Sequence, residues 1–221
     1  MNLLRIQDGI ARACARSGRE PATVRLVAAA KSVEAEAIGW VSEAGVTDVG
    51  ENYVQDLRAK RGVLAGVTWH YIGTLQSHTA HLVAEHADVV QTVTPGKAMR
   101  RLARRAAERG RTLPALIEVD FTAGRTGLAP EGVERFADEV AATEGLRLVG
   151  LMTLPPMQAS ASDARPWFVR LRELRDRVAR DHPETVELSM GMSLDYEVAV
   201  EEGATMVRIG TALFGARPPS A

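Results

Sequence analysis

Short apolar runs alternate with amphipathic stretches along almost the whole chain. In the first stretch Ile6, Ile10 and Cys14 recur at the spacing of one helical face, which predicts an opening helix. The apolar runs that follow are short enough to be buried strands, and stretches of helical period separate them. We expect strands at 24–30, 46–49, 70–73, 88–92, 114–119, 146–152, 186–188 and 205–209, and helices at 33–44, 53–61, 80–86, 97–109, 131–143, 165–180 and 196–202.

This alternation predicts a parallel sheet, because neighbouring parallel strands need a crossover connection and a helix can supply it. Eight strand–helix units in 221 residues favour an α/β fold with one domain, 1–221, built as a (β/α)8 barrel of the TIM type. A doubly wound open sheet is the alternative architecture.

Composition and charge narrow the class of protein. Apolar residues make up 46% of the chain and charged residues 25%, which is typical of a folded globular domain. Lys and Arg total 27 against 28 Asp and Glu, a net charge of −1, so we expect no nucleic-acid partner. The single cysteine, Cys14, allows no internal disulfide, and the five histidines lack metal-ligand spacing, so we expect no metal.

The distribution of apolar and charged residues also indicates where in the cell the protein is located. No apolar run approaches the roughly 18 residues that span a bilayer. Arg5, Asp8, Arg12 and Arg16 interrupt the apolar positions of the N-terminal stretch, which is not the pattern of a signal peptide. We therefore expect a cytoplasmic protein with no membrane partner.

Unusual polar residues follow the expected strands, where a barrel of this kind carries its chemistry. The first of them is Lys31, which ends the run 26–30 of small and apolar residues. Burial would lower the pKa of a lysine, and the neutral amine could form a Schiff base with a carbonyl compound. A lysine that extends to solvent from a strand end is the alternative interpretation.

The last two loops predict a phosphate site. The segments 189–193 and 208–211 supply small residues and hydroxyl groups, which let backbone amides approach phosphate oxygens. Because the eighth strand neighbours the first in a closed barrel, Lys31 would stand beside this phosphate. A Schiff-base lysine next to a phosphate site suggests a phosphorylated aldehyde, and pyridoxal phosphate (PLP) and a sugar phosphate both fit.

Two further residues allow more than one role. Arg208 could bind the anion, face the pyridine nitrogen of PLP, or form a salt bridge with an acidic residue. Asn52 could donate a hydrogen bond to a ring hydroxyl or cap the helix that follows it.

Six segments occur in an order that resembles one known family. They are Leu-Val-Ala-Ala-Ala-Lys at 26–31, Val-Gly-Glu-Asn-Tyr-Val-Gln at 49–55, Trp-His-Tyr-Ile-Gly-Thr-Leu-Gln at 69–76, Gly-Leu-Met-Thr-Leu-Pro-Pro at 150–156, Leu-Ser-Met-Gly-Met-Ser at 188–193 and the segment 201–215. The chain resembles the pyridoxal phosphate homeostasis protein family, called the YggS/PROSC family, from about residue 24 to 215. It departs from that family at Thr74, where many relatives have histidine, and at His78 and Thr79, where they have asparagine and lysine.

The resemblance implies a fold similar to the N-terminal domain of alanine racemase, and PLP as the cofactor. It also implies a role for each site residue: Lys31 carries PLP as a Schiff base, Ser193 and the amides of Gly210 and Thr211 hold the phosphate, Arg208 faces the pyridine nitrogen, and Asn52 lies near the ring.

The resemblance further implies a PLP-binding protein that buffers and supplies the cofactor, without established catalysis. Apo-enzymes that depend on PLP would be its candidate partners, and the lack of a racemase-type second domain predicts a monomer. A PLP-dependent amino acid racemase of narrow scope is the alternative. A Schiff-base aldolase acting on a sugar phosphate is a third hypothesis, which the residues permit but the resemblance disfavours.

Overall fold

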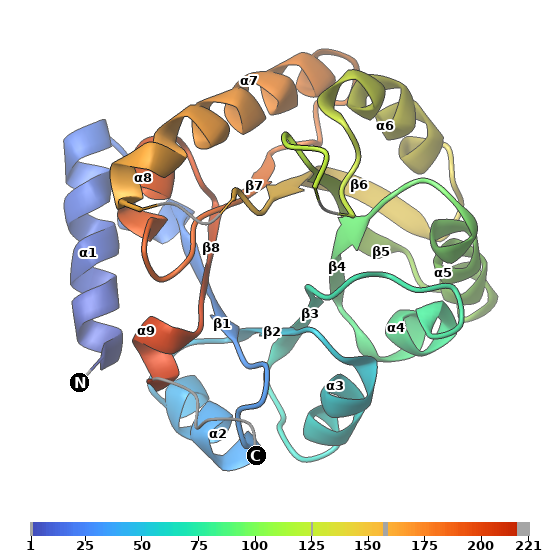
Figure 1. Cartoon of the computed structure of the whole chain (residues 1–221). Coiled ribbons are helices and arrows are strands. Elements are labelled where there is room, and N and C mark those ends of the chain that lie inside the picture. The colour runs from blue at the N-terminus through green and yellow to red at the C-terminus, as the bar shows by residue number, and fades with distance from the viewer. Residues whose placement is uncertain (1, 125, 157–158, 216–221) are drawn as a thin grey trace.

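The computed structural model describes residues 2–124, 126–156 and 159–215. In these residues, parallel strands pair in chain order and the last strand pairs with the first, which closes a barrel (Figure 1). The strands are β1 (Arg25–Ala29), β2 (Asp48–Glu51), β3 (Thr68–Tyr71), β4 (Val89–Val93), β5 (Leu113–Val119), β6 (Leu146–Thr153), β7 (Glu187–Ser189) and β8 (Met206–Ile209). Closure confirms the predicted barrel and excludes the open sheet, whose outermost strands have one neighbour each.

Helices surround the barrel as a ring (Figure 1). They are α1 (Asn2–Ser17), α2 (Ala35–Glu43), α3 (Val54–Arg61), α4 (Ala80–His86), α5 (Lys97–Glu108), α6 (Val133–Ala141), α7 (Arg165–Asp181), α8 (Tyr196–Glu201) and α9 (Thr211–Phe214), with short 3-10 turns at Pro21–Thr23, Pro130–Gly132 and Ala161–Ala164. The sequence did not predict α9, because four residues are too few to show a helical period. No helix in the described part of the chain has both the length and the apolar character needed to cross a membrane.

Two strands lie away from their predicted positions. β2 begins at Asp48 because the residues before it complete the C-terminal end of α2. Gly45 turns the chain with φ of 97°, and the Val46 amide then donates to the Val41 carbonyl oxygen. β3 begins at Thr68, whose amide donates to the Thr47 carbonyl oxygen. Both strands begin with a polar residue, Asp48 or Thr68, so hydrophobic pattern alone misplaced them.

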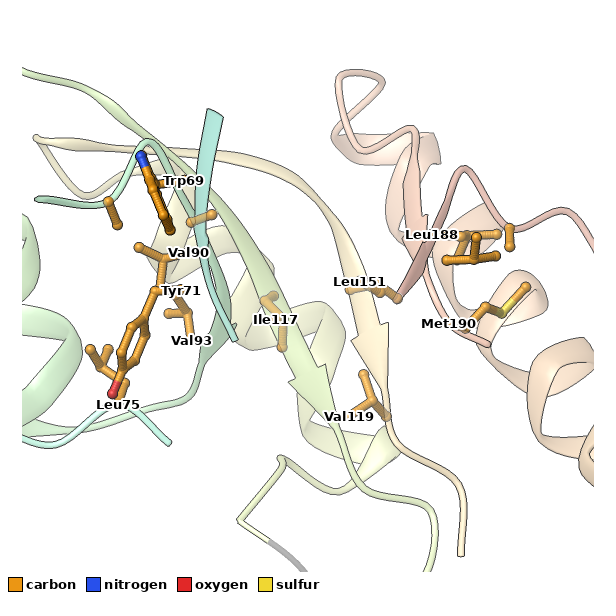
Figure 2. Packing of buried hydrophobic residues seen from close by; sticks show 14 of the residues in the cluster. Trp69, Tyr71, Leu75, Val90, Val93, Ile117, Val119, Leu151, Leu188 and Met190 are labelled. Carbon is orange, nitrogen blue, oxygen red and sulfur yellow. The ribbon is translucent and has the colours of Figure 1, made fainter. Parts of the chain in front are cut away.

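The apolar core has two layers. Most of it lies between the strands and the helices, where outward residues such as Trp69, Ile117 and Leu151 pack (Figure 2). A smaller cluster fills the inside of the barrel, and it includes Val27 and Leu116. Alternation along the strands produces this division, since successive side chains point to opposite faces of a sheet.

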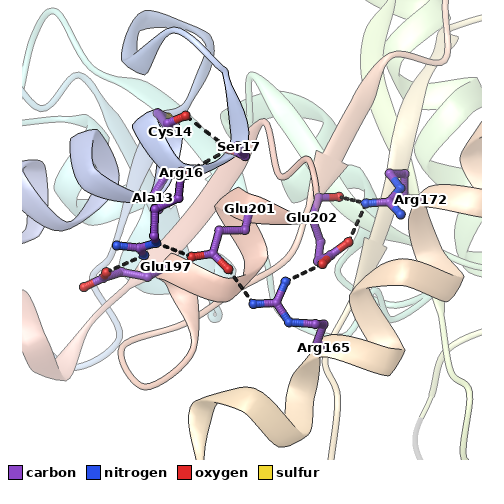
Figure 3. Close-up of polar contacts among 9 residues, drawn as sticks. All are labelled: Ala13, Cys14, Arg16, Ser17, Arg165, Arg172, Glu197, Glu201 and Glu202. Atoms are coloured by element: carbon purple, nitrogen blue, oxygen red, sulfur yellow. Dashed lines mark hydrogen bonds and ion pairs between the residues drawn. The ribbon is translucent and has the colours of Figure 1, made fainter.

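Ion pairs fasten α8 to its two neighbours. The Glu201 carboxylate binds Arg16 of α1 and Arg165 of α7, and Glu202 binds Arg165 and Arg172 (Figure 3). These contacts hold α8 between the first and the seventh helices, directly before β8.

Candidate functional site

The residues that the sequence singles out lie at one end of the barrel. Since the strands are parallel and the barrel is closed, the carboxyl ends of all strands form a single rim, which we call the mouth. These residues are Lys31 beyond β1, Asn52 beyond β2, Ser193 beyond β7, and Arg208, Gly210 and Thr211 in and beyond β8. The pairing of β8 with β1 brings the last group next to Lys31.

Lys31 is partly buried at the mouth. Its Nζ lies 5.3 Å from the centroid of the Tyr53 ring, within the range of a cation–π contact. Ser32 follows with φ of 58°, a left-handed conformation that few residues other than glycine adopt, so the chain turns sharply directly after the lysine. Lys31 thus leaves a rigid strand end and lies beside an aromatic ring.

A buried ion pair supports the strand end that carries Lys31. Lys60 of α3 donates to the Ala30 carbonyl oxygen at 3.0 Å and also binds the Glu51 carboxylate. Glu51 is fully buried, and its second oxygen accepts from the Asn52 amide at 3.1 Å. Burial raises the pKa of Glu51 above its ordinary value, although Lys60 opposes the shift. One buried pair therefore links the segments that present Lys31 and Asn52.

The loops after β7 and β8 meet through hydrogen bonds. Ser193 Oγ accepts from the Ala212 amide at 3.1 Å, so its hydroxyl hydrogen can be donated to a bound anion. Gly210 lies close to β1, because a Cβ there would stand 3.2 Å from the Ala29 carbonyl oxygen. Thr211 begins α9, and the first amides of a helix have no acceptor within it. Amide and hydroxyl donors therefore converge beside the end of β1.

Arg208 is buried inside the barrel just below these loops, with 4% of its surface exposed. Its Nη1 donates to Ser189 Oγ at 2.5 Å and its Nη2 to the Thr153 carbonyl oxygen at 2.9 Å. Burial lowers the pKa of the guanidinium to about 10, and the negative charges of Asp195 and Glu118 oppose that shift. Both hydrogen-bond acceptors are neutral, which differs from the salt bridge that the sequence allowed.

Asn52 does not cap the following helix. The N-cap residue of α3 is Tyr53, and no side-chain capping bond is formed. Asn52 instead lines a cavity of about 280 Å³ at the mouth, together with Tyr71, Thr74 and His78. Gly73 packs against it so closely that a Cβ would lie 1.9 Å from the Asn52 carbonyl oxygen. The cavity lies between the loops after β2 and β3, and Asn52 lines it on the β2 side.

Sequence reasoning missed several polar residues that the fold brings to the site. The Glu51–Lys60 pair is one example, and the interior residues His70 and Gln91 are another. Ser189, which the sequence placed in the phosphate loop, instead ends β7 inside the barrel and bonds to Gln91 and Arg208. Polar residues at inward positions of a strand would have signalled the second group, since the inside of such a barrel is usually apolar. Among the described residues, no group of three or more His, Cys, Asp or Glu side chains could hold a metal ion.

Comparison with known proteins places this arrangement in a family. The family model described as alanine racemase, N-terminal domain, matches residues 1–218. A pyridoxal phosphate homeostasis protein of Pseudomonas aeruginosa is 40% identical over 98% of this chain and 94% of its own length. The chain belongs to the alanine racemase N-terminal domain family, and within it to the pyridoxal phosphate homeostasis proteins. A relative of the same name from Aquifex aeolicus is 36% identical over 97% of this chain and 96% of its own.

Solved structures agree with this placement. PipY of Synechococcus elongatus, solved with PLP bound, has a TM-score of 0.83 and 33% identity and covers 93% of this chain and 100% of its own. An alanine racemase of Clostridium difficile has a TM-score of 0.75 at 15% identity, over 99% of this chain and 59% of its own. The second likeness shows that the barrel is shared. The family and fold that the sequence indicated are thereby confirmed.

Proposed function

We propose that this protein binds PLP at the mouth, carries it on Lys31 as a Schiff base, and serves intracellular PLP homeostasis by buffering and supplying the cofactor. One observation carries the proposal: an amine, a buried guanidinium and a group of amide and hydroxyl donors lie on the neighbouring strands β1, β7 and β8. PipY was solved with PLP, and the curated relatives are named for PLP homeostasis, which supports it.

The donors at the mouth fit the parts of PLP. Ser193 and the amides of Gly210 and Thr211 would hold the phosphate, because the first amides of α9 have no acceptor within the helix and Ser193 Oγ, which accepts from Ala212, can donate its own hydrogen. Arg208 would meet the pyridine nitrogen, which is a hydrogen-bond acceptor, with an N–H of its guanidinium. Asn52 would approach the ring from the β2 side of the mouth.

A carrier function agrees with the nature of Arg208. When bound, PLP supplies an electron sink for carbanion chemistry, most strongly when its pyridine nitrogen is protonated. A buried guanidinium donates a hydrogen bond to that nitrogen and disfavours its protonation, since two positive charges would then adjoin. Arg208 therefore favours holding the cofactor over using it.

A racemase of narrow scope is the second candidate, and Tyr53 is the observation that favours it. Its ring is half exposed at the mouth and lies next to Lys31. The other two tyrosines are engaged elsewhere: Tyr71 donates to the Thr74 carbonyl oxygen, and Tyr196 contacts Gly9 of α1. Exchange of the α-proton of amino acids in deuterated water, lost in Tyr53→Phe, would support this candidate over the carrier.

The cofactor assignment can be tested by its colour and its covalent mark. We expect the purified protein with PLP to show a visible absorption band, and borohydride reduction to leave a pyridoxyl group on the peptide that contains Lys31. Lys31→Ala should lose both, whereas the exposed Lys97→Ala should keep them. A colourless protein without a label on Lys31 would contradict the proposal.

We also propose a cytoplasmic monomer that passes PLP to apo-enzymes. Light scattering after size exclusion should give the mass of one chain. The loaded protein should restore activity to an apo-enzyme that needs PLP, faster than the release of PLP into buffer alone would allow. A dimer, or restoration at the rate of free release, would contradict the respective part.

A further inference from the structure

A row of hydrogen-bonded polar side chains crosses the inside of the barrel. It starts at Arg208 on β8 near the mouth, passes through Ser189 on β7 to Gln91 on β4, and continues through β3 to β2. The bonds are Arg208 Nη1 to Ser189 Oγ at 2.5 Å, Ser189 Oγ to Gln91 Oε1 at 2.6 Å, Gln91 Nε2 to His70 Nδ1 at 2.8 Å and His70 Nε2 to Asp48 Oδ1 at 2.8 Å. We call these five residues the interior relay.

The donor and acceptor roles in the interior relay follow one from another. A guanidinium can only donate, so Ser189 Oγ accepts from Arg208 and passes its own hydrogen to the amide oxygen of Gln91. The amide nitrogen of Gln91 can only donate, so His70 Nδ1 must accept. His70 then carries its hydrogen on Nε2 and donates it to Asp48. Every bond therefore points from the cation at one end to the carboxylate at the other.

Barrel closure does not require this row. Apolar side chains such as Val27, Leu116 and Met152 occupy much of the inner layer, and apolar side chains can fill such barrels without any desolvation penalty. Buried polar groups are costly unless each is satisfied, and His70, Gln91 and Ser189 are fully buried. The row ends on Arg208, a buried cation at the mouth. Its effect on the orientation of that guanidinium therefore explains it better than packing does.

We infer that Ser189, Gln91 and His70 are positioning residues, which hold the Arg208 guanidinium in one orientation at the mouth. Ser189 contacts it from the neighbouring strand β7, and Gln91 and His70 support Ser189 from β4 and β3. The inference rests on the proposed function for the identity of the group that Arg208 meets, the pyridine nitrogen of PLP. The relay fixes Nη1 through Ser189, while the Thr153 carbonyl oxygen fixes Nη2.

The negative charge that faces the relay supports this role. Asp195 and Glu118 act on Arg208 from the loop after β7 and from β5, and Asp48 stands at the far end of the relay. Thr47 and Arg25 also act on Asp48. Arg208 donates its hydrogen bonds to neutral oxygens, while Asp195 and Glu118 act on its charge without a direct hydrogen bond.

The first test needs no cofactor. In the ligand-free protein, nitrogen NMR of His70, assigned by comparison with His70→Asn, should show a neutral ring protonated on Nε2. Gln91→Met removes the amide that donates to Nδ1, so the Nδ1 signal of His70 should shift. A His70 ring protonated on Nδ1 in the unmodified protein would overturn the inferred direction of the relay, and with it the positioning role.

The second test follows Arg208 itself. With both terminal nitrogens fixed, the guanidinium should give separate Nη–H signals, and these should merge in Gln91→Met and in Ser189→Ala. Both variants should also raise the dissociation constant for PLP on the order of tenfold and shift its visible band. Leu116→Met, a volume-conserving change in the same inner layer, should alter none of these readouts.

The outcomes separate this inference from the proposed function. If the unmodified protein binds no PLP and the Arg208 signals still merge in both variants, the proposed function fails and the positioning role stands. If PLP binds and the Arg208 signals and the dissociation constant in both variants match those of Leu116→Met, the positioning role is overturned. Ser189→Ala removes a single oxygen, so it keeps the test available if Gln91→Met does not fold.

Discussion

Glu51 is a fully buried carboxylate whose partner Lys60 also holds the Ala30 carbonyl oxygen. At the scale of a single residue, such a pair stabilises the protein chiefly by avoiding an unpaired buried charge. Because Lys60 holds the residue directly before Lys31, loss of the pair should affect the site as well as the stability of the fold.

Lys60→Met should lower the free energy of unfolding by about 3 kcal/mol, because it leaves the Glu51 carboxylate buried without its cation. Adding Glu51→Gln to this variant should recover much of the loss. Urea denaturation measures both, with Lys97→Met on the surface as the control. Equal losses for the single and the double variant would contradict the argument.

The raised pKa of Glu51 predicts a pH dependence of known sign. In the folded state Glu51 keeps its proton to a higher pH than in the unfolded state, so the fold binds more protons between the ordinary value of 4.5 and the raised pKa. Stability contributed by Glu51 is therefore complete below 4.5 and falls as the pH rises through that window. Glu51→Gln should gain stability relative to the unmodified protein as the pH rises, measured by urea denaturation at several pH values.

Two glycines should respond to alanine in opposite directions. A Cβ at Gly73 would lie 1.9 Å from the Asn52 carbonyl oxygen, so Gly73→Ala must displace the backbone and should cost at least about 2 kcal/mol. Gly39 lies within α2, where a Cβ would make an ordinary contact of 3.6 Å with Leu64. Gly39→Ala should stabilise the protein by about 0.5 kcal/mol, because alanine loses less entropy in a helix. Denaturation midpoints of the two variants test this.

At the scale of elements, ion pairs join α8 to α1 and α7 (Figure 3). Glu201 serves both neighbours, and hydrogen bonds from Arg165, opposed by some burial and aided by Arg16, keep its pKa below the ordinary value. The arrangement explains how a helix of six residues can be held firmly before the strand that carries Arg208.

Glu201→Gln should destabilise the protein by about 1 kcal/mol, since both arginine partners are partly exposed and solvent weakens the pairs. The loss should shrink in 1 M salt, where screening is strong. Glu108→Gln breaks more exposed pairs on α5 and should change stability by less than about 0.5 kcal/mol. An equal effect of the two substitutions would show that the ion pairs of α8 contribute no more to the free energy of unfolding than exposed pairs on α5.

At the scale of the whole molecule, the proposed site spans the seam where β8 meets β1 and closes the barrel. A ligand that binds there favours the folded state. With PLP at about 100 times its dissociation constant, we expect about 2.7 kcal/mol of stabilisation and a Tm higher by roughly 5–10 °C. Calorimetry should show this rise for the unmodified protein and a smaller one for Lys31→Ala. An unchanged Tm at saturating PLP would contradict binding at the seam.

The sequence by itself determined the order of strands and helices and, through it, the barrel. Buried strands are continuous apolar runs and surface helices are amphipathic, so the type of each long element is a local property. It also determined that Lys31, Arg208 and the last loops would share one end, since the carboxyl ends of parallel strands meet there. Where local signals were weak, as at β2, β3 and α9, the predicted positions shifted or the element was missed.

The tertiary structure alone decided which polar groups meet. Gln91 and Ser189 are 98 positions apart in sequence, and Lys60 of α3 reaches the Ala30 carbonyl oxygen at the end of β1. Such partners depend on register, on which strand face is inward, and on how far a side chain extends across the barrel. These quantities are set when the sheet closes and not by local propensity. Short sequence segments therefore cannot predict which polar groups meet.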